Sequence, residues 1–136
     1  MKQFLINGGN TLFGDVEIES SKNALLPLIA GAILSEKTTT LHKVPNFLDI
    51  QNMIKILKHI GLKVDFKDET LIIDGALASK TEIGLELTSP LRSSIYAMGA
   101  LIGRFKKAKI CYPGGCDIGL RPIDLHLRGL KDLNVK

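Results

Sequence analysis

A continuous apolar run and a set of apolar residues at helical spacing predict two helices in the first half of the chain. The first is the apolar run ALLPLIAGAIL at 24–34, which Ser20 or Ser21 is expected to cap. Pro27 is tolerable only near the first turn of that helix, because proline removes a backbone donor. The second helix is predicted from apolar residues at i, i+3, i+4 and i+7, with Gly61 as its stop: Ile50, Met53, Ile54 and Leu57.

Alternating and β-branched positions predict strands around these helices. Val16 and Ile18 alternate with acidic residues, as in a half-buried strand. The segment TTTLHKV at 38–44 has high β propensity, and KVDF and TLIID on either side of a turn at Asp68–Glu69 predict a hairpin. The predicted order is β-α-β-α-β-β.

The chain carries an internal repeat. Shifted by 68 positions, residues 26–34 lie over 94–102, and the PNFLDI of 45–50 lies over the PGGCDI of 113–118. Five extra residues follow in the second copy, after which 57–64 matches 130–136 loosely. The second copy ends where the first still has its hairpin to come. We therefore interpret the chain as the N-terminal piece of something longer.

Length and charge narrow the possible partners. A chain of 136 residues is long enough for one compact domain, and a net charge of +4 favours anionic partners. Aromatic residues are only 5% and are not interleaved with Lys or Arg, so a base-stacking surface is not indicated, and phosphorylated small molecules fit at least as well. The longest apolar run is too short to cross a bilayer, which takes about 20 residues. We expect a cytoplasmic protein that binds neither nucleic acid nor membrane.

One loop, PGGCDIGLRPIDLH at 113–126, concentrates reactive residue types. Relative to the first copy, Gly114, Gly115 and Cys116 replace Asn46, Phe47 and Leu48, and an insert brings Arg121. Glycines let a backbone approach a ligand closely, an arginine suits phosphate or carboxylate, and a thiol near cations is tunable. The alternative is that Cys116 is a small buried hydrophobe and that the glycines only serve the turn. No second Cys/His pair completes a zinc site, so free thiols are expected, without metal or cofactor.

A second candidate site lies at the predicted helix starts. Lys22 and Asn23 stand at the start of the first helix, where backbone N–H groups favour anions. Arg92 stands at the corresponding start in the second copy. The alternative is that Ser21 caps the helix and Lys22 is simply solvated. Cys111, in a predicted strand, is expected to serve packing only.

These motifs resemble a known family. The segments GGNTLFGDVEIESSKNALLPLIAGAIL, SPLRSSIYAMGALIGR and PGGCDIGLRPIDLHLRGL are similar to UDP-N-acetylglucosamine 1-carboxyvinyltransferases, which are enolpyruvyl transferases. The resemblance runs over residues 1–136 but covers about a third of the family's length. The sister family acting on shikimate 3-phosphate lacks the cysteine loop. A basic nucleic-acid-binding α/β module is the alternative from a different class.

The resemblance implies the fold. It is an α+β fold of repeated β-α-β-α-β-β units, of the inverse α/β barrel or α/β prism type, with one unit and part of a second in this chain. Residues 1–20 are expected to be a strand segment that in the family belongs to the second domain. Residues 21–136 are expected to form an incomplete transferase domain, with unit one at about 21–87 and unit two at about 88–136.

The resemblance also implies roles for individual residues. Lys22 and Asn23 match a pair that contacts phosphoenolpyruvate and the sugar nucleotide, and Arg92 matches a substrate-binding arginine. Cys116 matches the proton donor, which also forms a covalent phosphoenolpyruvate adduct. A segment that grips the uridine end of UDP-N-acetylglucosamine is matched by Arg121, Pro122, Ile123, Asp124 and Leu125, with His126 following.

Two departures from the family pattern limit this expectation. Tyr96 replaces an expected tryptophan. The family's general base, an aspartate, and a further phosphoenolpyruvate-binding arginine belong to a C-terminal portion that this chain does not contain. The chain by itself is therefore not expected to complete a turnover, and that C-terminal portion is an expected partner.

Overall fold

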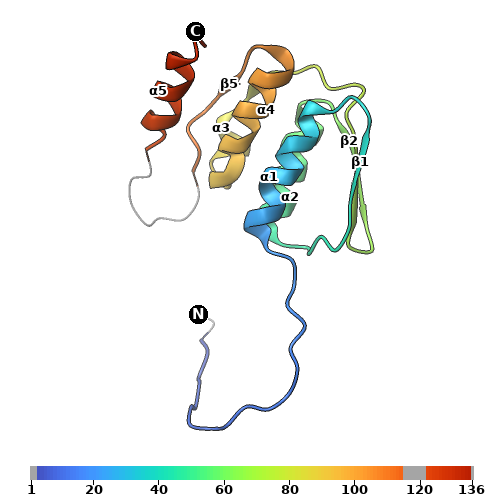
Figure 1. Ribbon diagram of the computed structural model, residues 1–136, viewed down its shortest axis with the longest axis vertical. Helices are drawn as coiled ribbons and strands as arrows, with labels where there is room; N and C mark the ends of the chain where they lie inside the picture. The colour runs from blue at the N-terminus through green and yellow to red at the C-terminus, as the bar shows by residue number, and fades with distance from the viewer. Residues whose placement is uncertain (1–2, 115–121, 136) are drawn as a thin grey trace.

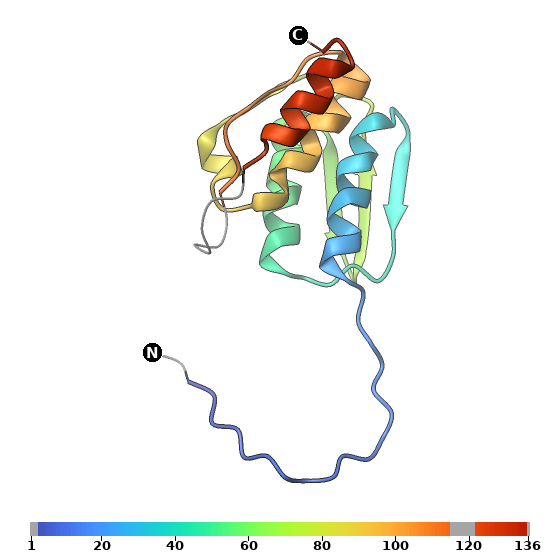
Figure 2. The same ribbon diagram turned by 60° about the vertical axis from the view of Figure 1, so that its left-hand side comes forward.

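Helices lie against one face of an antiparallel sheet in the computed structural model, which describes residues 3–114 and 122–135 (Figure 1). The helices α1 and α2 lie between the sheet and α4, and α5 lies beyond α4 (Figures 1 and 2). The elements in chain order are α1 (Lys22–Gly31), η1 (Ala32–Leu34), β1 (Thr38–Leu41), α2 (Leu48–His59), β2 (Lys63–Lys67), β3 (Thr70–Asp74), β4 (Glu82–Ile83), α3 (Leu85–Thr88), η2 (Arg92–Ser94), α4 (Ile95–Phe105), β5 (Lys109–Ile110) and α5 (Asp124–Asp132).

The first unit confirms the predicted hairpin and second helix. Strands β1, β3 and β2 pair in that order, and Asp68 and Glu69 both have positive φ, at 47° and 55°, as a two-residue hairpin turn requires. The predicted apolar face of α2 is buried in the core. Gly61 follows α2 at φ 102°, and a side chain there would approach the Leu77 carbonyl oxygen at 2.9 Å. Both the positive φ and the close approach of the Leu77 backbone therefore favour glycine at the end of α2.

The prediction about Pro27 is wrong. The helix α1 begins at Lys22, so Pro27 lies inside it rather than in its first turn. Ser21 is the N-cap residue, but its carbonyl, not its hydroxyl, accepts hydrogen bonds from the described helix, from the N–H groups of Ala24 at 3.1 Å and Leu25 at 3.0 Å. Proline removes only its own N–H donor and crowds the carbonyl of Asn23. The helix continues because Leu25, Leu26 and Ile29 beside it are buried in the core.

The strand predicted around Val16 and Ile18 does not form in this chain. The described residues before α1 have no regular secondary structure and extend away from the helices (Figure 2). Val16 is 85% exposed and Ile18 is 90% exposed. Alternation predicts a strand only where a partner supplies backbone bonds and an apolar surface, and no described strand pairs with this segment. Its assignment to a second domain stays a prediction.

The second unit begins as the repeat predicted, with helix α4, strand β5 and helix α5. Strand β5 of the second unit pairs in parallel with β4. Because β4 comes before the unit boundary predicted near residue 88, this pairing joins the two predicted units. Cys111 follows β5, and its N–H donates to the Ile83 carbonyl at 3.1 Å. Its side chain is exposed, so the prediction that it serves packing is wrong. The two-residue pairing ends before this side chain can be covered.

Arg104 on α4 joins the two units. Its Nη1 donates to the carbonyls of Ile33 at 2.9 Å and Ser35 at 3.2 Å, and its Nη2 donates to the Gly75 carbonyl at 2.8 Å. Its guanidinium carbon also lies 5.0 Å from the centre of the Phe105 ring. One partly buried side chain therefore satisfies one backbone carbonyl within η1, one just after η1 and one just after β3. None of the helices in the described ranges is long and apolar enough to cross a membrane.

Candidate active site

The helices α1, α2, α4 and α5 all begin at the same end of the molecule (Figures 1 and 2). We call this the helix-start end, defined by the first residues Lys22, Leu48, Ile95 and Asp124. The positive ends of the helix dipoles lie there, and the first N–H groups of a helix have no partner within that helix. Such an end favours anions, and phosphate in particular. The fold therefore places the predicted helix-start site at one location.

Lys22 is the first residue of α1, and it reaches across to α2. Its Nζ lies 2.5 Å from Oδ2 of Asp49, the second residue of α2. The two side chains are 48% and 29% exposed. They line a hollow of ≈ 310 Å³ together with Phe47 and Leu48. Asn23, next to Lys22, is exposed.

Arg92 begins η2, which runs directly into α4. The structure thus places it at the start of the second unit's apolar helix, as the repeat predicted. Its side chain is half-buried, whereas Lys22 is exposed. Both units carry a cation where their helix N-termini collect at the helix-start end.

The described start of the candidate loop is anchored to α3. The Gly114 N–H donates to the Thr88 carbonyl at 3.0 Å, and the buried Thr88 hydroxyl lies 3.4 Å from the Tyr112 carbonyl. A Cβ on Gly114 would lie 1.9 Å from the Ser89 carbonyl oxygen. The close contact of this glycine is with the protein's own backbone, which agrees with the alternative that it serves the turn. Gly115, Cys116 and Arg121 lie outside the described residues.

Replacing Gly114 by alanine is expected to lower the free energy of unfolding by about 1–3 kcal/mol, because the new methyl group forces backbone apart. Urea unfolding of the purified variant measures this. Gly99→Ala is the matched control, because a Cβ on Gly99 in α4 would meet nothing within 4 Å. Alanine in that helix is expected to be neutral or stabilising by about 0.5–1 kcal/mol. Equal stability of both variants would contradict the close approach at Ser89.

The rest of the candidate segment begins α5. Pro122 is exposed, Ile123 is buried, and Asp124 starts the helix with Leu125 and His126 exposed on it. His126 lines an apolar groove of ≈ 530 Å³ between α1, α4 and α5, which Tyr96 also lines. The structure brings this segment to the helix-start end, and the predicted uridine-binding role stays a prediction.

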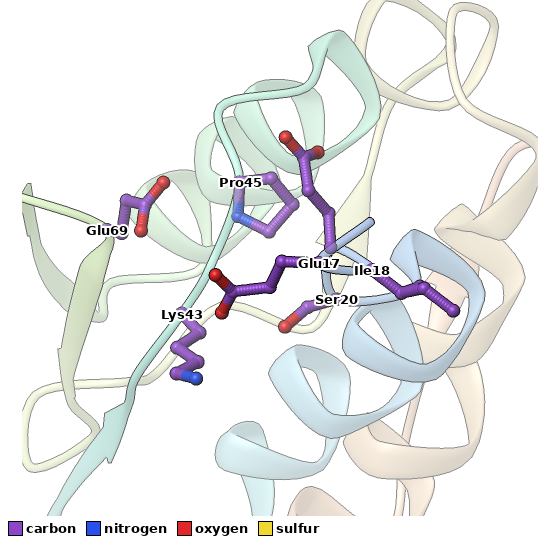
Figure 3. A pocket seen from close by; sticks show the side chains of 7 residues that line it. Glu17, Ile18, Ser20, Lys43, Pro45 and Glu69 are labelled. Atoms are coloured by element: carbon purple, nitrogen blue, oxygen red, sulfur yellow. The ribbon is translucent and has the colours of Figure 1, made fainter. Parts of the chain in front are cut away.

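A separate pocket, shown in Figure 3, contains none of the predicted site residues. It has a volume of ≈ 330 Å³ and lies between the segment preceding α1 and the connections after β1 and β2. Three glutamates and one lysine give it a net negative lining, which disfavours anions: Glu17, Glu19, Glu69 and Lys43. Within residues 3–114 and 122–135, no group of three His, Cys, Asp or Glu side chains is placed to hold a metal ion.

Sequence reasoning missed Asp49 and the anchor at Thr88 and Ser89. The repeat did match Asp49 to Asp117 in the shared P-x-x-x-D-I pattern, but nothing in the pattern indicated a role for it. The anchor had no sequence signal, because it joins residues that are distant along the chain.

Comparison with known proteins identifies the family. The model of the EPSP synthase (3-phosphoshikimate 1-carboxyvinyltransferase) family matches residues 6–136. The chain belongs to this family. The EPSP synthase family fold is also seen in the enolpyruvyl transferase NikO from Streptomyces tendae, whose crystal structure matches 70% of the chain and 22% of NikO, with a TM-score of 0.61 at 23% identity. The expected α+β enolpyruvyl transferase fold is thereby confirmed.

Several curated relatives are named UDP-N-acetylglucosamine 1-carboxyvinyltransferase. A UDP-N-acetylglucosamine 1-carboxyvinyltransferase 2 from Caldanaerobacter subterraneus subsp. tengcongensis is 50% identical over 136 residues, which are 100% of this chain and 33% of the relative. UDP-N-acetylglucosamine 1-carboxyvinyltransferases from Chloroherpeton thalassium and Halothermothrix orenii are 42% and 41% identical over 98% of the chain, or 31% and 32% of the relatives. The chain spans about a third of the length of these relatives. The resemblance seen in the motifs is confirmed.

Proposed function

We propose that this chain is the N-terminal part of an enzyme that transfers the enolpyruvyl group of phosphoenolpyruvate to the 3-hydroxyl of UDP-N-acetylglucosamine. The observation that carries the proposal is the common name of relatives that are 41–50% identical over 98–100% of the chain. The reaction is the first committed step of peptidoglycan synthesis. The protein would therefore act in the cytoplasm, in cell wall biogenesis and hence in cell shape and division.

The helix-start end supports this reaction because the substrates are anionic. Lys22 and Arg92 carry positive charge to helix N-termini, where phosphate is already favoured. Arg121 adds a third cation in the proposed site. These groups would stabilise the phosphate throughout the reaction and at its departure. Asn23 and the segment 122–126 would bind the sugar nucleotide, the segment at its uridine end.

Cys116 is proposed as the general acid. Addition to the enol group needs a proton on its terminal carbon, which leaves the adjacent carbon open to attack by the sugar hydroxyl. A thiol next to two glycines is suited to deliver that proton. The base that accepts the hydroxyl proton would come from the C-terminal portion of the enzyme, and the chemistry needs no cofactor.

The alternative within the family is transfer to shikimate 3-phosphate, the reaction that the name of the family model describes; the names of the curated relatives do not favour it. A chimera in which residues 1–136 replace the matching third of the Caldanaerobacter subterraneus relative distinguishes the two. We expect it to release phosphate from phosphoenolpyruvate with UDP-N-acetylglucosamine and not with shikimate 3-phosphate. The reverse preference would overturn the proposal.

The chain by itself is expected to release no phosphate from the same two substrates. The reason is that the proposed general base and one domain are contributed by the C-terminal portion. The measurement is phosphate release at equal concentrations of chain and chimera. Turnover by the chain above the level of its Cys116→Ala variant would contradict this prediction.

A further inference from the structure

We propose that Asp49 is a positioning residue for Lys22. Its carboxylate holds the lysine ammonium group between the N-terminal ends of α1 and α2, where an anionic substrate group would meet it. The geometry of the ion pair is independent of the proposed function. Only the identity of the anion as a substrate phosphate rests on that function.

The first argument is electrostatic. A cation at the first residue of a helix faces the positive end of that helix dipole, which disfavours it. Lys22 occupies this position in α1, so its ammonium group needs a compensating charge to stay there. Asp49 supplies one at 2.5 Å, from the first turn of α2, where an acidic side chain is itself favoured. The Asp49 carboxylate therefore compensates for the unfavourable position of the Lys22 ammonium group at the N-terminus of α1.

The second argument is that α2 holds Asp49 in place. The adjacent residue Ile50 is fully buried, and Met53 and Leu57 on the same face are also at 0% exposure. The first turn of α2 is thus fixed to the core, and its carboxylate is a fixed point for the long lysine side chain. A lysine held in one position loses less conformational freedom when an anion binds.

The third argument is access. The Lys22 side chain is 48% exposed and lines the hollow with Phe47, which is 38% exposed, and Leu48, which is 73% exposed. The ion pair is therefore partly exposed to solvent. An anion arriving at the helix-start end can contact the ammonium group while Asp49 still holds it from the other side.

The test is competitive acylation of the lysines in the folded chain at limiting acetic anhydride, mapped by peptide mass. Asp49→Asn is expected to raise the labelling rate of Lys22 by about two- to fivefold, the size of effect typical of a partly exposed ion pair. Asp49→Glu is expected to restore slow labelling. Asp49→Ser also suits a helix start, so it provides a second uncharged variant if the asparagine variant folds poorly.

Glu82→Gln is the matched control, because Glu82 pairs with Lys109 at 3.2 Å on another part of the surface. It is expected to change the labelling of Lys109 and not of Lys22. Unchanged labelling of Lys22 in folded Asp49→Asn and Asp49→Ser would overturn the proposal. So would an equal rise of Lys22 labelling in Glu82→Gln, because the effect would then not depend on the Asp49 contact.

A second measurement connects the pair to anion binding. Inorganic phosphate is expected to protect Lys22 from labelling, and half-protection in Asp49→Asn should need about two- to fivefold more phosphate. Equal half-protection in both proteins would overturn the positioning role toward anions. If phosphate protects Lys22 in neither the unchanged chain nor Asp49→Asn, that result would contradict the role of Lys22 in binding substrate phosphate. The labelling rates without phosphate would still decide whether Asp49 holds Lys22.

Discussion

Replacing Cys116 by serine in the chimera is expected to lower the rate of enolpyruvyl transfer by about 100- to 10,000-fold, the range over which a positioned general acid contributes. The physical reason is acidity. A thiol ionises near pH 8.5, within reach of a proton transfer at neutral pH, whereas a serine hydroxyl is far less acidic. Phosphate release at saturating UDP-N-acetylglucosamine measures the effect.

Cys111→Ser is the matched control, because Cys111 is a second thiol five residues away. Its side chain is exposed, and only its backbone N–H makes the contact to Ile83, which serine keeps. Activity within about twofold of the unchanged chimera is expected, as for other surface substitutions. Equal losses from the two serine variants would show that the wrong thiol has been assigned.

Replacing Arg104 by alanine is expected to lower the free energy of unfolding by about 2–4 kcal/mol. The change removes charged donors from the carbonyls of Ile33, Ser35 and Gly75, and hydrogen bonds to charged groups contribute about 1.5–3 kcal/mol each before partial exposure is considered. Urea unfolding with an unchanged dependence on denaturant concentration is the measurement.

Lys107→Ala is the control for this variant. Lys107 is an exposed cation close to Arg104 in sequence, and its loss is expected to change stability by less than about 0.5 kcal/mol. A midpoint for Arg104→Ala equal to that of Lys107→Ala would show that the three carbonyl bonds do not matter to stability. Arg104→Lys should fall between the two, since lysine keeps the charge but lacks the planar fork.

The first unit could be predicted from the sequence because its signals are local. The apolar spacing in α2, the stop at Gly61 and the turn at Asp68–Glu69 each depend on residues a few positions apart, and all three are confirmed. The strand predicted at Val16 and Ile18 does not form. Alternation indicates that one face of a segment is apolar, but it does not show that a neighbouring strand is present to pair with it. The prediction that Pro27 lies in the first turn was wrong, because burial of its neighbours in the core stabilises the helix by more than the loss of one backbone hydrogen bond destabilises it.

The candidate site was predicted only in part, for the same reason. Lys22 and Arg92 were found because helix starts and the repeat are visible along the chain. The contact between Lys22 and Asp49 joins residues 27 positions apart, and the bonds of Arg104 reach residues 29 to 71 positions away. Gly114 was singled out for the conformational freedom of its backbone. In the structure it is the absence of a side chain that allows its close contact with the Ser89 backbone.

The common direction of α1, α2, α4 and α5 has an energetic consequence for the whole domain. Parallel dipoles placed side by side repel each other, so the folded chain accumulates unfavourable electrostatic energy at the helix-start end. Burial of apolar residues in the core must offset that energy. An anion bound at the same end relieves it, and the stability of the folded state then rises with the logarithm of the ligand concentration relative to Kd. The ligand-free protein therefore carries unfavourable electrostatic energy at the helix-start end, and binding of an anion there reduces that energy.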